Sequence, residues 1–293
     1  MTTAIAPTRI GPATFDWGTR TYVMGILNLT PDSFSGDGLL DATDPVAAAV
    51  AQGRAMVADG ADVLDVGGES TRPGHATVDA ATELERVVPV VAALRAALPS
   101  TPISIDTTKA AVAEAALDAG ADLLNDVTGT DPDSPITAIA AARGVPLVLM
   151  HTRAEARYAD VVAEVVADLQ AAVDRAVAAG AAPGNVIVDP GIGFGKTAQH
   201  NVAVLHDLSR LQRIGRPILL GTSRKSTLGK ILDLPVDERL EGTLATTALG
   251  IAGGVDVVRV HDVRANVRAA RVSDAIVRGA WREGDPSPRG GRP

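Results

Sequence analysis

Short runs of apolar and β-branched residues alternate along the chain with longer, Ala-rich segments. The short runs have the length and composition of buried strands, and the Ala-rich segments have the length of helices. The predicted strands are Tyr22–Leu27, Asp62–Val66, Ile103–Ile105, Asp122–Leu124, Pro146–Met150, Asn185–Val188, Pro217–Leu220 and Asp256–Val260. The predicted helices include Pro45–Asp59, Ala80–Ala97, Ala110–Ala119, Tyr158–Ala179, Gln199–Arg213 and Glu238–Ala252. The pattern therefore predicts repeated strand–helix units.

The ends of several predicted helices repeat one short motif, Gly-x-Asp, which leads directly into a strand. It occurs at Gly60–Asp62, Gly120–Asp122 and Gly254–Asp256. Glycine supplies the left-handed residue that ends a helix, and a tight turn into the next strand favours parallel strands with right-handed crossovers. Near-continuous apolar strands fit a sheet that is covered on both faces.

Eight such units favour a closed (β/α)8 TIM barrel over an open doubly wound sheet, because they fill the barrel with none left over. We predict a single barrel domain over residues 18–282. Residues 1–17 and the Pro-, Gly- and Arg-rich residues 283–293 are expected to be loosely ordered tails.

Polar residues follow nearly every predicted strand. One such residue could be a helix cap or a turn former, as with Asp106 or Asp189. In a barrel, however, all of these positions meet at the carboxyl-terminal mouth, where barrel enzymes place their sites. The residues concerned are Asn28, Glu69–Gly74, Asp106, Asn125, Asp126, His151, Asp189, Ser223–Ser226, Arg259, His261 and Asp262.

The composition excludes several classes of protein. The chain has 293 residues, 46% of them hydrophobic, which fits a globular protein with a sizeable core. Its formal net charge of −8 argues against nucleic acid as the main partner, and the absence of cysteine excludes disulfides and thiol chemistry. Neither a signal peptide nor an apolar run long enough to span a membrane is recognisable, so a cytoplasmic location is expected.

The residue types at the mouth suggest two kinds of ligand. Asp106, Asn125, Asp189 and Lys225 could bind an amino-pyrimidinone edge, as in a pterin or guanine, because a carboxylate accepts two neighbouring N–H groups. Separately, Asn28, Arg72, Arg259 and His261 suit a phosphate or pyrophosphate with Mg²⁺.

Seven motifs, in order and at the predicted strand ends, resemble those of dihydropteroate synthases. They are Met24–Ser35, Gly67–Gly74, Ile103–Thr107, Asn125–Asp126, Asp189–Lys196, Gly221–Ser226 and Arg259–Asp262. The resemblance covers residues 22 to about 278. It implies a (β/α)8 barrel that joins p-aminobenzoate to 6-hydroxymethyl-7,8-dihydropterin pyrophosphate, requires Mg²⁺ and forms a homodimer.

The resemblance also implies a role for individual residues. The pterin pocket would be formed by Asp106, Asn125, Met150, Asp189, Phe194 and Lys225. The p-aminobenzoate pocket, which sulfonamides also occupy, would be formed by Phe34, Thr71, Arg72, Pro73, Gly74 and Ser226. Pyrophosphate would be held by Arg72, Arg259 and His261, and the metal by Asn28. Catalysis would rest on Asp106, Lys225, Arg259 and His261.

The first loop departs from the family pattern. The family commonly reads Asp-Ser-Phe-Ser-Asp-Gly-Gly, whereas this chain has Gly36 followed by Asp37, so the acidic residue near the metal falls one place later, at Asp37.

Two other interpretations of the function stay open. A methyltetrahydrofolate:corrinoid methyltransferase has a similar pterin pocket but needs no Thr-Arg-Pro loop, and a non-catalytic paralogue would bind pterin without turnover.

Overall fold

The computed structural model describes residues 5–30, 44–69, 77–279 and 281. Eight strands form one sheet in the order β8-β7-β6-β5-β4-β3-β10-β9, and each pairs in parallel with its neighbours. A parallel bridge between Val188 and Ile218 joins the two ends of the sheet, so the predicted barrel is confirmed. The strands are β3 (Tyr22–Asn28), β4 (Val63–Gly67), β5 (Ile103–Asp106), β6 (Leu123–Asp126), β7 (Leu147–Met150), β8 (Val186–Asp189), β9 (Leu219–Leu220) and β10 (Val257–Val260).

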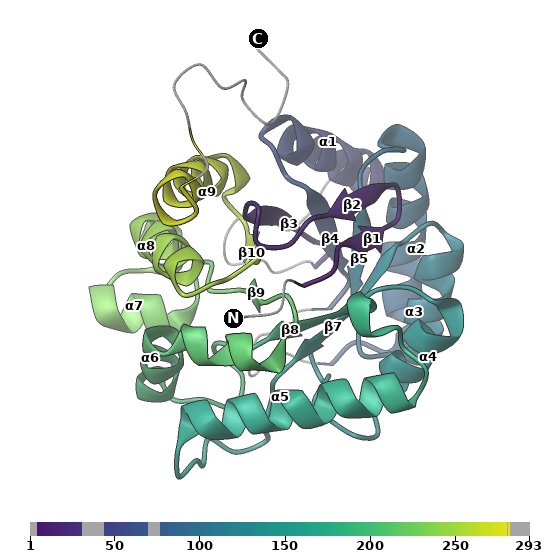
Figure 1. Cartoon of the computed structure of the whole chain (residues 1–293). Helices are drawn as coiled ribbons and strands as arrows, with labels where there is room; N and C mark the ends of the chain where they lie inside the picture. The colour runs from purple at the N-terminus through teal and green to yellow at the C-terminus, as the bar shows by residue number, and fades with distance from the viewer. Residues whose placement is uncertain (1–4, 31–43, 70–76, 280, 282–293) are drawn as a thin grey trace.

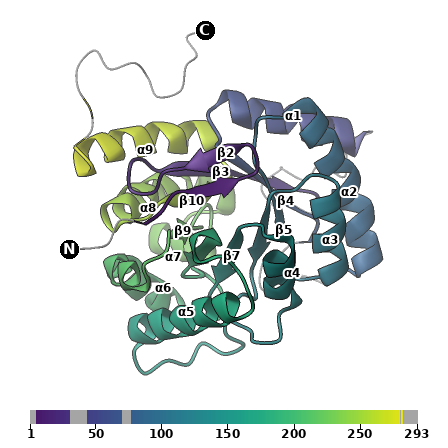
Figure 2. The same cartoon turned by 45° about the vertical axis from the view of Figure 1, so that its right-hand side comes forward.

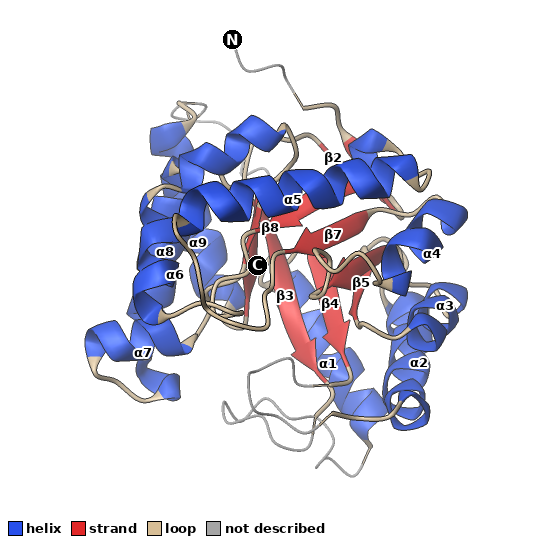
Figure 3. Cartoon of the chain, turned by 90° about the horizontal axis from the view of Figure 1, so that it is seen from below, coloured by secondary structure: helices blue, strands red, loops and turns tan. Residues whose placement is uncertain are grey.

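The helices surround the strands in chain order, from α1 at the top of Figure 1 through α5 at the bottom to α9 at the upper left. Seen from below in Figure 3, the red strands lie inside this ring of blue helices. The helices are α1 (Pro45–Ala58), α2 (Ala80–Ala97), α3 (Ala110–Asp118), α4 (Pro135–Arg143), α5 (Val161–Ala178), α6 (Ala198–His206), α7 (Ser226–Leu232), α8 (Leu240–Ala252) and α9 (Val263–Val277). The main core lies between the outer faces of the strands and the inner faces of these helices.

The Gly-x-Asp motif links helix ends to strand pairing. Its glycines have left-handed φ values of 102°, 112° and 93°, as the sequence predicts. The carboxylates of Asp62, Asp122 and Asp256 each accept a backbone N–H from a neighbouring strand segment, at 2.8, 2.9 and 3.0 Å. The motif therefore ends the helix and also fixes the position of the next strand at the amino-terminal end of the barrel.

One predicted helix is interrupted. The segment Gln199–Arg213 was expected to be continuous, but α6 ends at His206 and a 3₁₀ helix covers Leu208–Ile214. Leu208, Leu211 and Ile214 are buried at the three-residue spacing of a 3₁₀ helix, so tertiary packing decides the geometry here.

The prediction of a loosely ordered N-terminal tail is wrong from Thr8 onward. The strands β1 (Thr8–Ile10) and β2 (Ala13–Phe15) form an antiparallel hairpin that lies over the strands, inside the ring of helices (Figures 1 and 2). Phe15 and Trp17 are buried, and the ring centroids of Phe15 and Tyr22 are 4.4 Å apart. These side chains pack on the first residues of β4, β6, β9 and β10. The hairpin thus closes the end of the barrel opposite the mouth.

The predicted C-terminal tail, residues 283–293, lies outside the described residues. Among the helices that the structure describes, none is long and apolar enough to cross a membrane.

Candidate functional site

The carboxyl ends of four adjacent strands place polar groups side by side. Asn28 of β3 pairs with Gly67 of β4, Gly67 pairs with Asp106 of β5, and Asp106 pairs with Asn125 of β6. A side chain at Gly67 would fall between its neighbours, since a Cβ there would lie 3.7 Å from Asp106 Cβ and 3.9 Å from Asn28 Oδ1. Gly67 therefore leaves open the space between the Asn28 amide and the Asp106 carboxylate.

A buried ionic network crosses the mouth from β10. Arg259 Nη2 lies 2.7 Å from Asp106 Oδ2, and Arg259 Nε lies 2.5 Å from Asp65 Oδ2. Asn125 Nδ2 donates to the same Asp65 oxygen at 3.2 Å. Among the described residues, the second carboxylate oxygens of Asp65 and Asp106 have no hydrogen-bond partner, although both are buried. Each carboxylate therefore has one buried oxygen without a partner among the described residues.

The burial of this network shifts its ionisation. Burial raises the pKa of Asp106 to about 7, against the opposing effect of Arg259. Burial alone would lower the pKa of Arg259, but Asp65 and Asp106 raise it above its usual value. The guanidinium thus stays charged, whereas the Asp106 carboxyl titrates near neutral pH.

Asp189 and Lys225 form the opposite side of the mouth. A Cβ built on Gly221 would lie 3.9 Å from Asp189 Oδ2, from Lys225 Nζ and from Arg259 Cβ, so these three side chains surround one position. Burial raises the pKa of Asp189, while burial lowers the pKa of Lys225 to about 8. Lys225 Nζ also donates to Ile192 O and lies 4.7 Å from the centroid of the Phe194 ring.

The β10 end and the β9–α7 turn support each other. His261 Nδ1 lies 3.0 Å from Ser223 Oγ, and the His261 backbone N–H donates to the same oxygen at 3.2 Å. Arg224 has a left-handed φ of 58° and binds Asp262 through Nη2 and Nε at 2.7 and 3.0 Å. These contacts fix the turn that presents Lys225 and the orientation of His261.

A third ionic group borders the mouth at the start of α3. Lys109 Nζ donates to the carboxylates of Glu69 and Glu83, and Glu69 accepts the Val78 N–H at 3.2 Å. A cavity of about 220 Å³ opens here. It is lined by Glu69, Glu83, Asp106, Thr107, Thr108, Val127, Thr128, Thr152 and Phe194.

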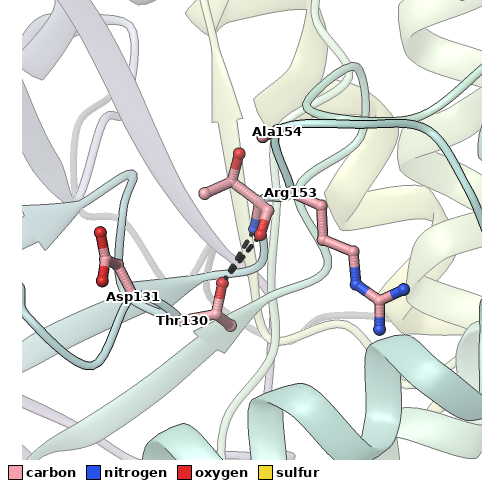
Figure 4. A pocket seen from close by; sticks show the side chains of 5 residues that line it. Thr130, Asp131, Arg153 and Ala154 are labelled. Carbon is pink, nitrogen blue, oxygen red and sulfur yellow. Dashed lines mark hydrogen bonds between the residues drawn. The ribbon is translucent and has the colours of Figure 1, made fainter.

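A larger hollow of about 410 Å³ lies beside the mouth, between the loops that follow β6 and β7 (Figure 4). Thr130 and Thr152 on its wall bind each other, with the Thr152 N–H 3.1 Å from Thr130 Oγ1. Arg153 is bound to Asp168 and Glu164 at 2.7 and 2.6 Å. The side chains of Thr130 and Arg153 in the wall of this hollow are therefore already bound to other protein groups. The smaller cavity, which Asp106 lines, fits the predicted chemistry better.

The structure brings together most of the predicted residues that it describes. Met150 is buried at the end of β7 and pairs with Asp189, while Ser226 is exposed as the first residue of α7. Phe34, Asp37, Thr71, Arg72, Pro73 and Gly74 lie outside the described residues. The predicted p-aminobenzoate pocket is thus represented here only by Ser226.

Sequence reasoning missed four charged residues beside the mouth. They are Asp65, Glu83, Lys109 and Lys196. A signal existed for Asp65, because a carboxylate in the middle of an apolar strand needs a buried cation. Glu83, Lys109 and Lys196 lie on helices or in a loop, where the sequence pattern is also that of surface residues.

Known proteins match this chain closely. The family model described as pterin binding enzyme matches residues 24–261. Dihydropteroate synthase from Clostridium beijerinckii is 48% identical over 92% of this chain and 99% of its own length. The dihydropteroate synthase from Bacillus subtilis is 46% identical over 91% of this chain and 92% of its own length.

Two solved structures extend the similarity to the fold. Dihydropteroate synthase from Clostridium difficile, solved in the presence of pteroic acid, has a TM-score of 0.85 and 46% identity, covering 90% of this chain and 99% of the other. Dihydropteroate synthase from Xanthomonas albilineans, solved with 4-aminobenzoic acid, has a TM-score of 0.83 and 42% identity, covering 90% and 94%. The resemblance found in the motifs is confirmed.

Proposed function

Because the chain belongs to the pterin-binding enzymes and its relatives are dihydropteroate synthases, we propose that its mouth joins a dihydropterin pyrophosphate to p-aminobenzoate. The products are 7,8-dihydropteroate and pyrophosphate. The observation that carries this proposal is the convergence of Asp106, Asn125, Asp189, Lys225 and Arg259 on one mouth. The methyltransferase alternative has no comparable support, because the relatives named above are synthases.

The pterin is held by its polar edge between two sides of the mouth. Asp189 accepts N–H bonds from the amino-pyrimidinone edge, and Asn125 serves the neighbouring edge. Lys225 binds a ring carbonyl or nitrogen from the other side. Met150 and Phe194 supply the apolar walls that cover the ring faces.

The reaction exchanges a C–O bond for a C–N bond. The C–O bond of the pterin methylene breaks, and its electron pair leaves with pyrophosphate. The free Asp106 oxygen faces the resulting cation and stabilises it electrostatically. The lone pair of the arylamine nitrogen then forms the C–N bond, and the nitrogen gives up its extra proton to water or to the departing pyrophosphate. No covalent enzyme intermediate is needed.

The departing anion is held by cationic and N–H groups on β10 and directly after it. Arg259 supplies two N–H donors, and Ser223 orients His261 toward the same end of the mouth. We propose that His261 donates to pyrophosphate and that Arg72 adds a further cation.

The metal expected here is Mg²⁺. Within the described residues, no group of three or more His, Cys, Asp or Glu could hold an ion. Mg²⁺ at phosphate sites is commonly bound through one or two protein oxygens, together with waters and the substrate, so Asn28 Oδ1 fits as a sole described ligand. The bound ion would neutralise the charge that develops on pyrophosphate. Asp37 is a second proposed ligand.

A homodimer is proposed through α8 and α9, which pack side by side (Figure 1). Leu249, Val272 and Ile276 are 69%, 62% and 77% exposed on these helices, and a second copy packed on this face would cover them. Ile276→Asp should convert a dimer to a monomer in light scattering.

The cytoplasmic location expected from the sequence stays a prediction.

The test is incubation of the purified protein with the dihydropterin pyrophosphate, p-aminobenzoate and Mg²⁺. The expected result is stoichiometric pyrophosphate and dihydropteroate. A protein that binds pterin with normal affinity but releases no pyrophosphate would be the non-catalytic paralogue. A parallel reaction with a chelator tests the metal, and it should proceed at a small fraction of the full rate.

A further inference from the structure

A buried ionic chain lies behind the loop that carries Phe194. His151 follows β7, and its side chain is completely buried. Its Nε2 lies 3.0 Å from Asp168 Oδ2 on α5, and its Nδ1 lies 2.8 Å from Lys196 Nζ. Burial lowers the pKa of Lys196 to about 7. When Lys196 is protonated it can only donate, so Nδ1 accepts from it and the ring proton lies on Nε2, where it is donated to Asp168. This fixes His151 as a neutral ring of one tautomer, and burial lowers its pKa to about 4.

Lys196 uses its remaining two N–H groups inside the loop itself. Its Nζ lies 3.1 Å from Gly191 O and 3.1 Å from Phe194 O. Together with His151 Nδ1, these carbonyls satisfy all three donors of the ammonium. The side chain therefore closes residues 191–196 into a ring and attaches that ring to the end of β7.

The loop has further ties, because the Gly193 N–H donates to Asn201 Oδ1 at 2.9 Å and the Tyr158 hydroxyl donates to Gly195 O at 2.8 Å. It also turns on closely packed backbone. Gly191 and Gly195 have φ values of 65° and 57°. A Cβ at Gly191 would lie 1.8 Å from His151 O, and one at Gly195 would lie 2.1 Å from Arg153 O, so only glycine fits. Glycine gives the backbone freedom to adopt other shapes, and Lys196 restricts that freedom by binding two carbonyls of the loop with one ammonium group.

The same loop sets the position of Lys225. Between the two carbonyls that bind Lys196 lies Ile192, whose carbonyl accepts from Lys225 Nζ. The Phe194 ring lies 4.7 Å from that same Nζ. Two lysines are thus bound by neighbouring carbonyls of one loop, with Lys225 on the side of the mouth and Lys196 on the side of His151.

We infer that Lys196 is a positioning residue. Held by His151, it fixes the Gly191–Gly195 loop so that Phe194 and the Ile192 carbonyl place Lys225 for pterin binding. Lys196 itself touches no substrate. The pterin part of this inference rests on the proposed function.

The test compares Lys196→Met with Lys230→Met, which makes the same substitution at an exposed lysine of α7. The readouts are the Kd of pterin-6-carboxylate, which binds without reacting, the KM for each substrate and the thermal midpoint. Lys196→Met should weaken pterin binding about tenfold or more, as expected for a lost hydrogen-bond network to a charged group. The KM for p-aminobenzoate should stay within about twofold. Lys230→Met should change neither constant.

A matched pair at His151 separates positioning from general stability. The amide oxygen of Asn can stand in for Nδ1 and accept from Lys196, whereas the longer Gln reaches Asp168 and leaves Lys196 without this acceptor. His151→Gln should therefore weaken pterin binding as Lys196→Met does, and His151→Asn should retain most of it. Equal losses of thermal midpoint with an unchanged pterin Kd in all variants would overturn the inference.

The outcomes for the two proposals are distinguishable. If the wild type binds pterin but releases no pyrophosphate, the proposed reaction is wrong, and the Kd comparison still decides the role of Lys196. If the wild type is active and Lys196→Met binds pterin normally, only the role of Lys196 is wrong. A wild type that binds no pterin contradicts both.

Discussion

Arg259 of β10 and Asp106 of β5 form an ion pair at the barrel mouth, with Arg259 Nη2 2.7 Å from Asp106 Oδ2. The pair uses one oxygen of the carboxylate, and the other has no partner among the described residues. Before substrate binds, the group proposed to stabilise the cation and the group proposed to hold pyrophosphate therefore neutralise each other. A substrate that carries both a pterin and a pyrophosphate can supply new partners for both.

The first prediction concerns the charge on Asp106. Asp106→Asn keeps the size of the side chain and part of its hydrogen bonding but removes the negative charge. If the carboxylate stabilises a cation that exists only during reaction, kcat should fall on the order of 10²-fold or more, with little change in the KM for the pterin substrate. Steady-state kinetics measure both constants.

Pyrophosphate release without arylamine provides the control for this prediction. Cation formation needs no p-aminobenzoate, so Asp106→Asn should slow this partial reaction as well. If the variant instead raises the KM for the pterin and keeps kcat, Asp106 acts in ground-state binding only.

The second prediction concerns pH. Burial raises the pKa of Asp106 to about 7, so the carboxylate is charged above that pH and is lost as pH falls through it. Burial lowers the pKa of Lys225 to about 8, so its positive charge is lost above that pH. The kcat/KM for the pterin substrate should rise toward pH 7 and fall above pH 8, because this constant reports groups of the free enzyme. In Asp106→Asn the decrease of kcat/KM below pH 7 should disappear. If the decrease persists, it reports the ionisation of the substrate or of another group.

The fold was predictable because its signals are local. Apolar runs, helix-length segments and the Gly-x-Asp motif each occupy a few consecutive residues, and a barrel repeats them. The N-terminal hairpin was missed because β1 and β2 have three residues each, too few for a periodic pattern. Their stability comes instead from Phe15 and Trp17 packing on strands that occur much later in the chain.

The site was predictable as a set of strand ends but not as a set of contacts. Strand order alone brings Asn28, Asp106 and Asn125 together. The pairing of Arg259 with Asp65 joins residues 194 positions apart, and it depends on which way each side chain turns inside the barrel. Lys196 shows the same limit, because its partners are two carbonyls and a ring nitrogen that have no sequence signature.

The third prediction concerns the hairpin at the closed end of the barrel. Phe15→Ala should destabilise the protein by about 3–5 kcal/mol, because it removes a buried aromatic ring and leaves a cavity. Thr14→Ala, at an exposed position of the same strand, should change stability by less than about 0.5 kcal/mol. Urea unfolding measures both. The kcat of folded Phe15→Ala should match the wild type, and a large loss of kcat would show that the hairpin influences the mouth.

The last prediction concerns Asp65, which binds both Arg259 Nε and Asn125 Nδ2 through one oxygen and is completely buried. In Asp65→Asn the Arg259 guanidinium loses a charged partner. The NH₂ group of the new amide can also be turned toward the N–H groups of the guanidinium, and two donors cannot bind each other. Breaking a buried ion pair by removing one partner typically costs about 3–5 kcal/mol, so the variant should be clearly less stable. Asp118→Asn, which alters the exposed pair with Arg143, should cost about 1 kcal/mol or less.

Stability alone does not establish that Asp65 acts through Arg259, so a double-mutant cycle with Arg259→Lys is required. If Asp65 serves mainly to hold the guanidinium for pyrophosphate, each single variant should lower kcat/KM by at least about tenfold. The double variant should then be little worse than Arg259→Lys, since the positioned group is already absent. Independent, multiplying losses would instead assign Asp65 a role of its own, such as binding the pterin directly through its second oxygen.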